Sequence, residues 1–447
     1  MTVESCLFGR CRSPFNLVVT ASLLAGLILS APKGLAQNVR PITLREAVQI
    51  ALKQNPDAAL ARIEALKASH EAVEARAAFS ASVYAGSGLG YTDGIPQSIE
   101  GANPSIVQVT GRRPLYDRSL LRQIRAANED AQAASFRSLS KKDEIAFQVA
   151  TTFLDFESER RRVGLITEQA DRLGRAEKAV AARVEEGREI ELSLTRARLE
   201  KARAERRLAE ANSRELLLET TLRVQIGIAD DIALDPRREE LGLAGRMPES
   251  AAAGARQALA NSPELKSLAA QIRARDQGVE VARGALYPKL DVIAQYSMLS
   301  RFNNFEKFFN DFQRHNFQVG ISLQAPIYAG KSVSSRIERA RIEAREAELR
   351  HASRQSSLAI ESHRLYQRVE EADGLFRLAK MELDYSRESL DVFLAEYEEG
   401  RIALDQLERA RAEESIAWEA YYRSLYILEK ARLNVLRGSG ELAAALD

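Results

Sequence analysis

The chain repeats four landmarks in the same order at nearly constant spacing, which restricts it to a fold built from two copies of one unit. An Xaa-Pro pair and an Ala-Arg pair each recur after 207 positions, a Pro-Xaa-Tyr triplet recurs after 212, and a Glu-Glu-Gly-Arg tetrapeptide recurs after 213. The landmarks are Asn55-Pro56 and Ser262-Pro263, Ala75-Arg76 and Ala282-Arg283, Pro114-Leu115-Tyr116 and Pro326-Ile327-Tyr328, and Glu185-Glu186-Gly187-Arg188 and Glu398-Glu399-Gly400-Arg401. Because the repeated unit combines short alternating strands with very long helices, it indicates an assembly that forms a tube rather than a pocket.

The first 36 residues have the pattern of a secretory signal. Arg10 and Arg12 precede a short apolar run, and small residues leading up to Ala36 fit a cleavage site. The run is short for a membrane span. We therefore expect residues 1–36 to be removed near Ala36, rather than to remain as a membrane anchor.

Composition narrows the class of protein further. Both cysteines, Cys6 and Cys11, lie in the predicted signal, so the exported part has no disulfide. Without the signal the net charge is −1, which gives no electrostatic footprint for nucleic acid. Outside the signal no apolar stretch is long enough for a membrane-spanning helix. If the mature chain crosses a bilayer, we expect strands to do so.

The two copies predict the same succession of elements. Each begins with a helix that is interrupted at its Xaa-Pro pair, because proline can open a helix but cannot continue one. Two strands follow, and then a proline-free helical run of about 68 residues, or on the order of 100 Å, ends at a glycine and turns back. The predicted strands cover about residues 79–92, 105–116, 287–299 and 316–328, and the predicted helical hairpins cover 119–224 and 332–436. We therefore predict a first structural repeat over residues 37–245 and a second over 246–447.

The predicted strands are amphipathic. Phe317, Val319, Ile321 and Leu323 alternate with small or polar residues, which places the apolar side chains on one face. A membrane barrel needs at least eight strands, so four strands per chain would require an oligomer, and three chains would supply twelve. The alternation alone fits equally well an ordinary soluble sheet with one face on a core.

The sequence contains no recognisable catalytic constellation. The segment Gly330-Lys331-Ser332 lacks the earlier glycine of a phosphate-binding loop, and the four histidines occur singly, without neighbouring ligands at metal-site spacing. We expect no enzymatic activity, no cofactor and no bound metal.

The hairpin tips carry the recurring charged tetrapeptide and are the strongest candidates for an interaction surface. A glycine with mixed charges around it suits the docking of another helical hairpin, although a solvated turn would explain the residue types as well. The eight candidate docking residues are Glu185, Glu186, Gly187, Arg188, Glu398, Glu399, Gly400 and Arg401.

Three segments resemble the TolC family of outer-membrane efflux proteins, and the resemblance extends over nearly all of the mature chain. They are Ile42-Thr43-Leu44-Arg45-Glu46-Ala47 through Asn55-Pro56, Tyr287-Pro288-Lys289-Leu290, and Val319 to Gly330. The resemblance implies a mainly α fold with β structure, in which a homotrimer joins a 12-stranded transmembrane β-barrel to an α-helical barrel of long coiled-coil hairpins.

The family resemblance also implies a function and partners. The trimer would lie in the outer-membrane lipid and extend into the periplasm as the passive exit duct of a tripartite efflux or type I secretion system. A periplasmic adaptor and an inner-membrane pump would open its periplasmic tip, and drugs, dyes, metals or secreted proteins are all cargo of the family. The alternative is a periplasmic coiled-coil adaptor or scaffold that never enters a membrane.

The resemblance further implies a gate at the second tip. Gly187 and Gly400 match the tip glycines of the family, and Tyr397 matches a tyrosine that helps to hold the entrance closed. We expect a gate formed by Tyr397, Arg401, Asp405 and Glu408, with Glu398 and Glu399 contributing to its salt bridges. Members of the family often carry a ring of aspartates that makes the entrance sensitive to cations. Asp405 is one position away from the usual spacing of these aspartates, so the sequence does not decide whether this chain has such a ring. Glu186 and Glu399 replace apolar residues of the relatives, which leaves the identity of the adaptor open.

Overall fold

The computed structural model describes residues 38–88, 105–229, 232–238, 243–299, 313–328, 330–402 and 404–446. The chain divides into two units, Met1–Asn38 and Val39–Asp447, and all described residues except Asn38 belong to the second. The predicted signal and most of the residues between the two predicted strands of each copy lie outside the described residues.

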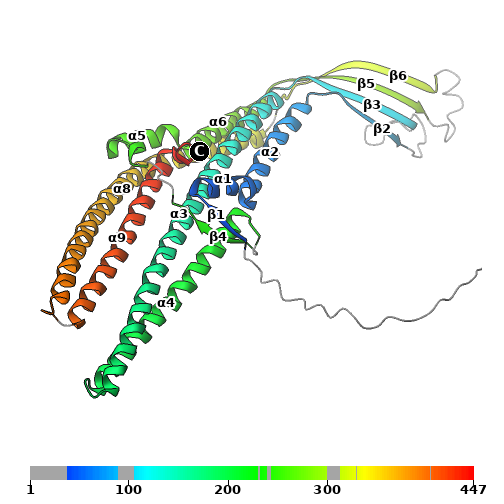
Figure 1. Cartoon of the computed structure of the whole chain (residues 1–447). Coiled ribbons are helices and arrows are strands. Elements are labelled where there is room, and N and C mark those ends of the chain that lie inside the picture. Colours follow the sequence, from blue (N-terminus) through cyan, green and yellow to red (C-terminus); the bar gives the residue numbers. More distant parts are fainter. Residues whose placement is uncertain are drawn as a thin grey trace, which may run out of the picture. The chain divides into compact units, whose positions relative to one another are not determined.

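Each helix of the first copy has a counterpart of nearly equal length in the second (Figure 1). The counterparts are α1 (Leu44–Gln54) and α5 (Ala251–Asn261) with 11 residues each, α2 (Pro56–Ala77) and α6 (Pro263–Gly284) with 22 each, α3 (Arg118–Glu185) and α8 (Gly330–Glu398) with 68 and 69, and α4 (Glu191–Ile226) and α9 (Leu404–Ser439) with 36 each. The extra residue of α8 explains why the spacing of the landmarks rises from 212 to 213. Two long helical hairpins result, formed by α3 with α4 and by α8 with α9.

Side-chain caps set where these helices begin. Thr43 Oγ1 accepts the N–H of Glu46 at 3.3 Å, and Asn55 Oδ1 accepts the N–H of Asp57 at 2.8 Å. Asn55 thus ends α1 and opens α2, whose first residue is Pro56.

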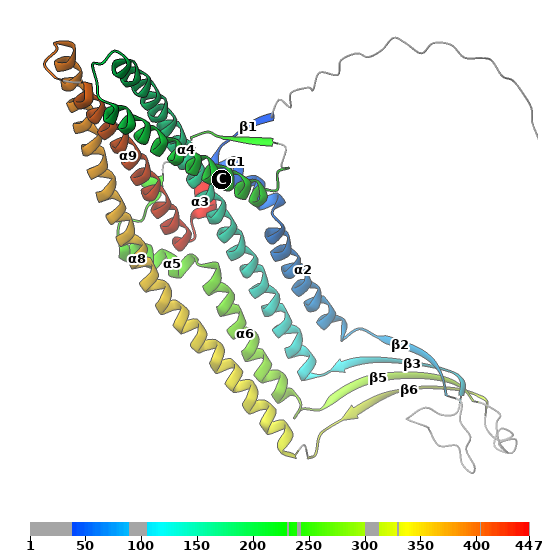
Figure 2. The ribbon, with the colours of Figure 1, turned by 90° about the horizontal axis from the view of Figure 1, so that it is seen from below.

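Four strands form one antiparallel sheet in the order β2–β3–β5–β6. They are β2 (Ser82–Gly88), β3 (Ser105–Tyr116), β5 (Lys289–Leu299) and β6 (His315–Gln324). The central pairing of β3 with β5 joins the two copies, and Figure 2 shows the four strands continuing from the ends of α2, α3, α6 and α8. Register shifts between Gly86 and Gly88 and between Pro114 and Tyr116 mark bulges.

Two further strands were not predicted from the sequence. β1 (Asn38–Ile42) and β4 (Ile232–Pro236) form a separate two-stranded sheet. Each has five residues and contains a proline, so neither gives a clear period-two pattern. The 3₁₀ helix η1 (Leu243–Arg246) and the short helix α10 (Leu442–Leu446) were also not predicted.

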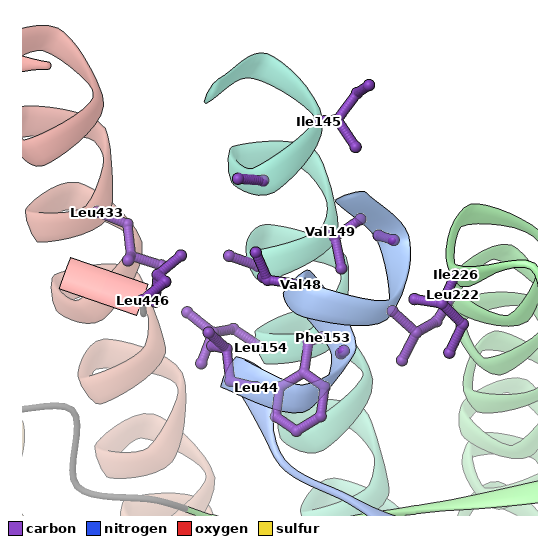
Figure 3. Close-up of a cluster of buried hydrophobic side chains, with 14 of the residues drawn as sticks. Leu44, Val48, Ile145, Val149, Phe153, Leu154, Leu222, Ile226, Leu433 and Leu446 are labelled. Atoms are coloured by element: carbon purple, nitrogen blue, oxygen red, sulfur yellow. The ribbon is translucent and has the colours of Figure 1, made fainter. Parts of the chain in front are cut away.

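The main hydrophobic core surrounds α1, which lies among α3, α4, α9 and α10 (Figure 3). Leu44 and Val48 of α1 contact a cluster that includes Phe153 of α3, Leu222 of α4 and Leu433 of α9. Away from this core the long helices bury mainly small side chains, which lets the helices approach closely. The buried alanines include Ala133, Ala134, Ala204, Ala211, Ala344, Ala372, Ala379, Ala410 and Ala417.

Candidate functional site: the hairpin tips and the faces of the sheet

The first tip connects α3 to α4 through a left-handed glycine. Gly187 has a φ of 68°, and its N–H donates to the carbonyl of Val184 at 3.0 Å. The N–H of Arg188 donates to the carbonyl of Arg183 at 2.8 Å. This pair of bonds is a Schellman motif, which satisfies the last carbonyls of α3 and explains why glycine is placed there.

The second tip repeats this geometry between α8 and α9. Gly400 has a φ of 72°, its N–H donates to the carbonyl of Tyr397 at 3.0 Å, and the N–H of Arg401 donates to that of Glu396 at 2.8 Å. Tyr397, which was predicted for the gate, therefore takes part in the turn through its backbone, while its side chain is 38% exposed. The second tip presents this ring where the first presents Val184.

Each tip arginine forms an ion pair with the glutamate two residues before it. Arg188 lies 3.2 Å from Glu186, and Arg401 lies 2.8 Å from Glu399. All four side chains are more than half exposed, so each pair contributes at most about 1 kcal/mol to stability. Glu185 and Glu398 end α3 and α8 and are also exposed. All eight predicted docking residues therefore lie at the two tips.

Among the described side chains of one chain, Tyr397, Arg401 and Glu408 do not form one network. Arg401 pairs with Glu399, and Glu408 pairs with Arg411 one turn along α9 at 2.8 Å. Asp405 is the second residue of α9, and its side chain lies outside the described residues.

The sheet has one apolar face and one polar face. Cross-strand pairs such as Val292 with Ile321 and Tyr296 with Phe317 place apolar side chains on the same face. The side chains of β6 on this face, Phe317, Val319, Ile321 and Leu323, are 63–70% exposed. In β6 the alternating apolar side chains share one face, and no described residue covers that face.

The opposite face carries hydrogen-bonded polar groups. Gln295 donates to Ser297 at 3.3 Å, and Arg112 donates to Asp291 at 2.5 Å. Sequence reasoning missed the Arg112–Asp291 pair, because it depends on the register between strands of different copies. The available signal was Asp291 itself, which is the one acidic residue of β5.

None of the described helices is sufficiently long and apolar to cross a membrane. The described part of the chain also contains no group of three or more His, Cys, Asp or Glu side chains that could hold a metal ion.

Comparison with known proteins agrees with this geometry. Residues 254–437 match the family described as outer membrane efflux protein. The pyoverdine export outer membrane protein OpmQ of Pseudomonas aeruginosa is 27% identical over 157 residues, which are 35% of this chain and 32% of OpmQ. The chain thus matches about a third of the length of this curated relative.

The fold is that of known outer-membrane channels. The CusC crystal structure superposes with a TM-score of 0.73 at 12% identity, covering 89% of this chain and 92% of CusC. The outer membrane channel CmeC of Campylobacter jejuni gives a TM-score of 0.72 at 15% identity, covering 89% of this chain and 86% of CmeC. The duplicated hairpins and the amphipathic sheet thus give this chain the fold of these channels, and its residues 254–437 are similar to the outer membrane efflux protein family.

Proposed function

We propose that three copies of this chain form a passive exit duct that spans the outer membrane and the periplasm. The single observation that carries this proposal is the four-stranded sheet, with an exposed apolar face, a polar opposite face and two edges that have no strand partner among the described residues. A membrane barrel requires this arrangement, with the apolar face toward lipid and the polar face toward the lumen.

The order of the strands supports closure by further copies. Because all neighbours in β2–β3–β5–β6 are antiparallel, β6 runs opposite to β2. The β6 of one chain can therefore pair with the β2 of the next in the same antiparallel pattern, and three chains close twelve strands. Closure also removes two edges that would otherwise be open to aggregation.

The packing of the duplicated helices also supports a closed ring of three chains. Within the chain α3 packs against α6, whereas their counterparts α8 and α2 make no comparable contact. Both counterparts expose apolar side chains that another chain would cover. They are Leu60, Ile63, Leu66 and Val73 on α2, and Ile342 and Leu349 on α8.

The two tips are the proposed docking site of a periplasmic adaptor, which connects the duct to an inner-membrane pump. Residues 183–191 hold two arginines and four glutamates, and residues 396–405 hold one arginine, three glutamates and an aspartate. An adaptor with basic side chains at its own tip would complement this acidic surface.

The gate belongs to the second tip in this proposal. Tyr397, Arg401, Asp405 and Glu408 would hold the closed entrance through bonds to neighbouring helices and chains. The first tip carries Val184 and Leu192 where the second has Tyr397 and Asp405, so the first copy would supply stable walls.

The proposal is tested by fractionating cells that express the full chain. We expect heat-modifiable trimers in the outer-membrane fraction, with a mature N-terminus at Gln37. A soluble monomeric pool in the periplasm would instead favour a coiled-coil adaptor or scaffold.

The gate is tested by single-channel recording in planar bilayers. Neutralising Arg401 and removing the Tyr397 hydroxyl together, as Arg401→Gln with Tyr397→Phe, should raise the conductance of the trimer. Arg188→Gln makes the corresponding charge change at the first tip and should leave it unchanged. Equal conductance of the double variant and the native protein would exclude this gate.

A further inference from the structure

Arg113 is the one lysine, arginine or carboxylate side chain on the apolar face of the described sheet. The register pairs Arg113 of β3 with Val292 of β5, and Val292 with Ile321 of β6. Paired residues share a face, so the Arg113 side chain leaves the sheet on the apolar side. Its neighbour Arg112 lies on the polar side.

The sheet offers Arg113 no carboxylate. Asp291 is the one acidic residue within the four strands, and it lies on the opposite face, 2.5 Å from Arg112. Closing three chains into a barrel adds no other acid, because each chain brings the same four strands. Arg113 is exposed and forms no ion pair with any described residue, so its counter-anion must come from outside the sheet.

Arg113 also lies near the helical end of the sheet. It precedes Tyr116, the last residue of β3, by three positions. Exposed aromatic side chains gather at this end, with Tyr116 42%, Tyr287 39% and Tyr328 90% exposed. Tyrosines concentrate at the boundary between the apolar membrane core and the headgroups.

We propose that Arg113 binds the phosphate of an anionic phospholipid in the leaflet nearest the helices. The proposal rests on the proposed membrane barrel. A charged side chain on the lipid face is tolerated best near the interface, where a long side chain can reach the headgroups. The planar guanidinium presents paired N–H donors to phosphate oxygens, while the acyl chains cover the apolar side chains of the same face.

The duplication sets the number of sites. At the landmark spacing of 212, the residue of the second copy that corresponds to Arg113 is Ala325. The unit therefore folds without an arginine at this position, and a trimer would hold one lipid site per chain. The counterpart also indicates that Arg113→Ala will not disrupt the fold.

The test uses full-chain trimers in nanodiscs of phosphatidylcholine with a minor fraction of phosphatidylglycerol, followed by native mass spectrometry of the retained lipids. The native trimer should retain up to three phosphatidylglycerol molecules and favour this lipid roughly fivefold per site, the preference expected for one arginine near an anionic surface. Arg113→Gln and Arg113→Ala should abolish the preference, and Arg113→Lys should keep part of it. The matched control is Arg336→Gln, which removes an exposed charge on α8 outside the sheet.

Two results would overturn the proposal while leaving the duct intact. One is an unchanged phosphatidylglycerol preference in Arg113→Gln. The other is loss of the native preference on adding millimolar inorganic phosphate, which would identify a site for free anions. If the native chain does not enter phosphatidylcholine bilayers as a trimer, the proposed function fails and this inference with it.

Discussion

Arg161 of α3 donates from Nε to the hydroxyl of Tyr426 on α9 at 2.8 Å and so joins the first copy of the repeat to the second. Arg161 also donates to Glu157 at 3.0 Å, and the Tyr426 side chain is only 2% exposed. Burial, together with the charge of Glu157, raises the pKa of Tyr426, so the hydroxyl stays protonated. Further bonds between the same helices follow in antiparallel order: Asp155 with Lys430, Arg162 with Glu419, and Arg172 with Ser415.

Tyr426→Phe should destabilise the protein by about 1–2 kcal/mol, because it leaves the partly buried Arg161 guanidinium without one acceptor while keeping the aromatic ring. The measurement is the thermal or denaturant unfolding of detergent-solubilised protein. Tyr385→Phe is the control, since Tyr385 is 74% exposed on α8 and should change stability by less than about 0.5 kcal/mol. Equal effects of the two substitutions would show that the Arg161–Tyr426 bond does not stabilise the contact between α3 and α9.

Gly284 permits the close contact between the end of α6 and the start of α3. A Cβ at this position would lie 2.6 Å from the Ser119 backbone nitrogen and 2.7 Å from its Cα. Gly284→Ala should therefore cost about 1–3 kcal/mol through overpacking. Gly278→Ala, on the same helix with nothing within 4 Å, should instead stabilise the protein by about 0.5–1 kcal/mol.

The comparison is decisive because the two substitutions are expected to change the stability of the protein in opposite directions. If Gly284→Ala raised the melting temperature as Gly278→Ala is expected to do, the close approach of α6 to Ser119 would not constrain the native fold.

The elements that could be predicted from the sequence are those specified by local residues. Asn55-Pro56 and Ser262-Pro263 mark helix boundaries because a cap and a proline act within one turn, and Gly187 and Gly400 mark the tips for the same reason. The strand alternation was equally local. Each of these features was also seen twice, so the duplication itself served as a check.

The features that could not be predicted depend on contacts between distant segments. β1 and β4 are held together although about 190 residues separate them, and each is too short to show a period. The pairings of Arg112 with Asp291 and of Arg161 with Tyr426 required the register and the packing of elements from different copies. At the tips, residue types could be assigned from the sequence, but the partner of Arg401 within the chain, Glu399, became evident only from the geometry.

Glu399→Gln should weaken the docking of the adaptor while leaving the stability of the protein nearly unchanged. The Glu399–Arg401 pair is exposed, so its loss should change stability by less than about 1 kcal/mol. If the acidic tip binds a basic adaptor, the same change should weaken copurification of that adaptor and reduce the salt dependence of the complex. Glu388→Gln, which neutralises an exposed carboxylate on α8 away from the tip, is the matched control. Adaptor capture that was equal for both variants would exclude Glu399 from the docking surface.

The stability of the protein depends on pH near neutrality because of Asp143 of α3. It lines a pocket with Ser140, Glu264, Arg354 and Arg437 and forms no ion pair with the residues that the structure describes. Burial raises the pKa of Asp143 from its ordinary value of 3.8 to about 6. Because the folded pKa is higher than the unfolded one, the stability from this group is fully present below about pH 4 and is lost as pH rises through about 6.

Asp143→Asn removes the cost of holding this charge in the pocket, so the variant should be more stable than the native protein at pH 7.5. A shift of about two pKa units has an upper bound of about 3 kcal/mol, and partial exposure reduces the expected gain to roughly 1–2 kcal/mol. The gain should shrink as pH falls toward about 4.5, where the native carboxyl is mostly protonated. Ser140→Ala changes the same pocket without removing a titrating group, and its effect should be independent of pH. The measurement is the difference in unfolding free energy between each variant and the native protein at both pH values, and a gain for Asp143→Asn that is equal at pH 4.5 and 7.5 would show that Asp143 does not titrate in this range.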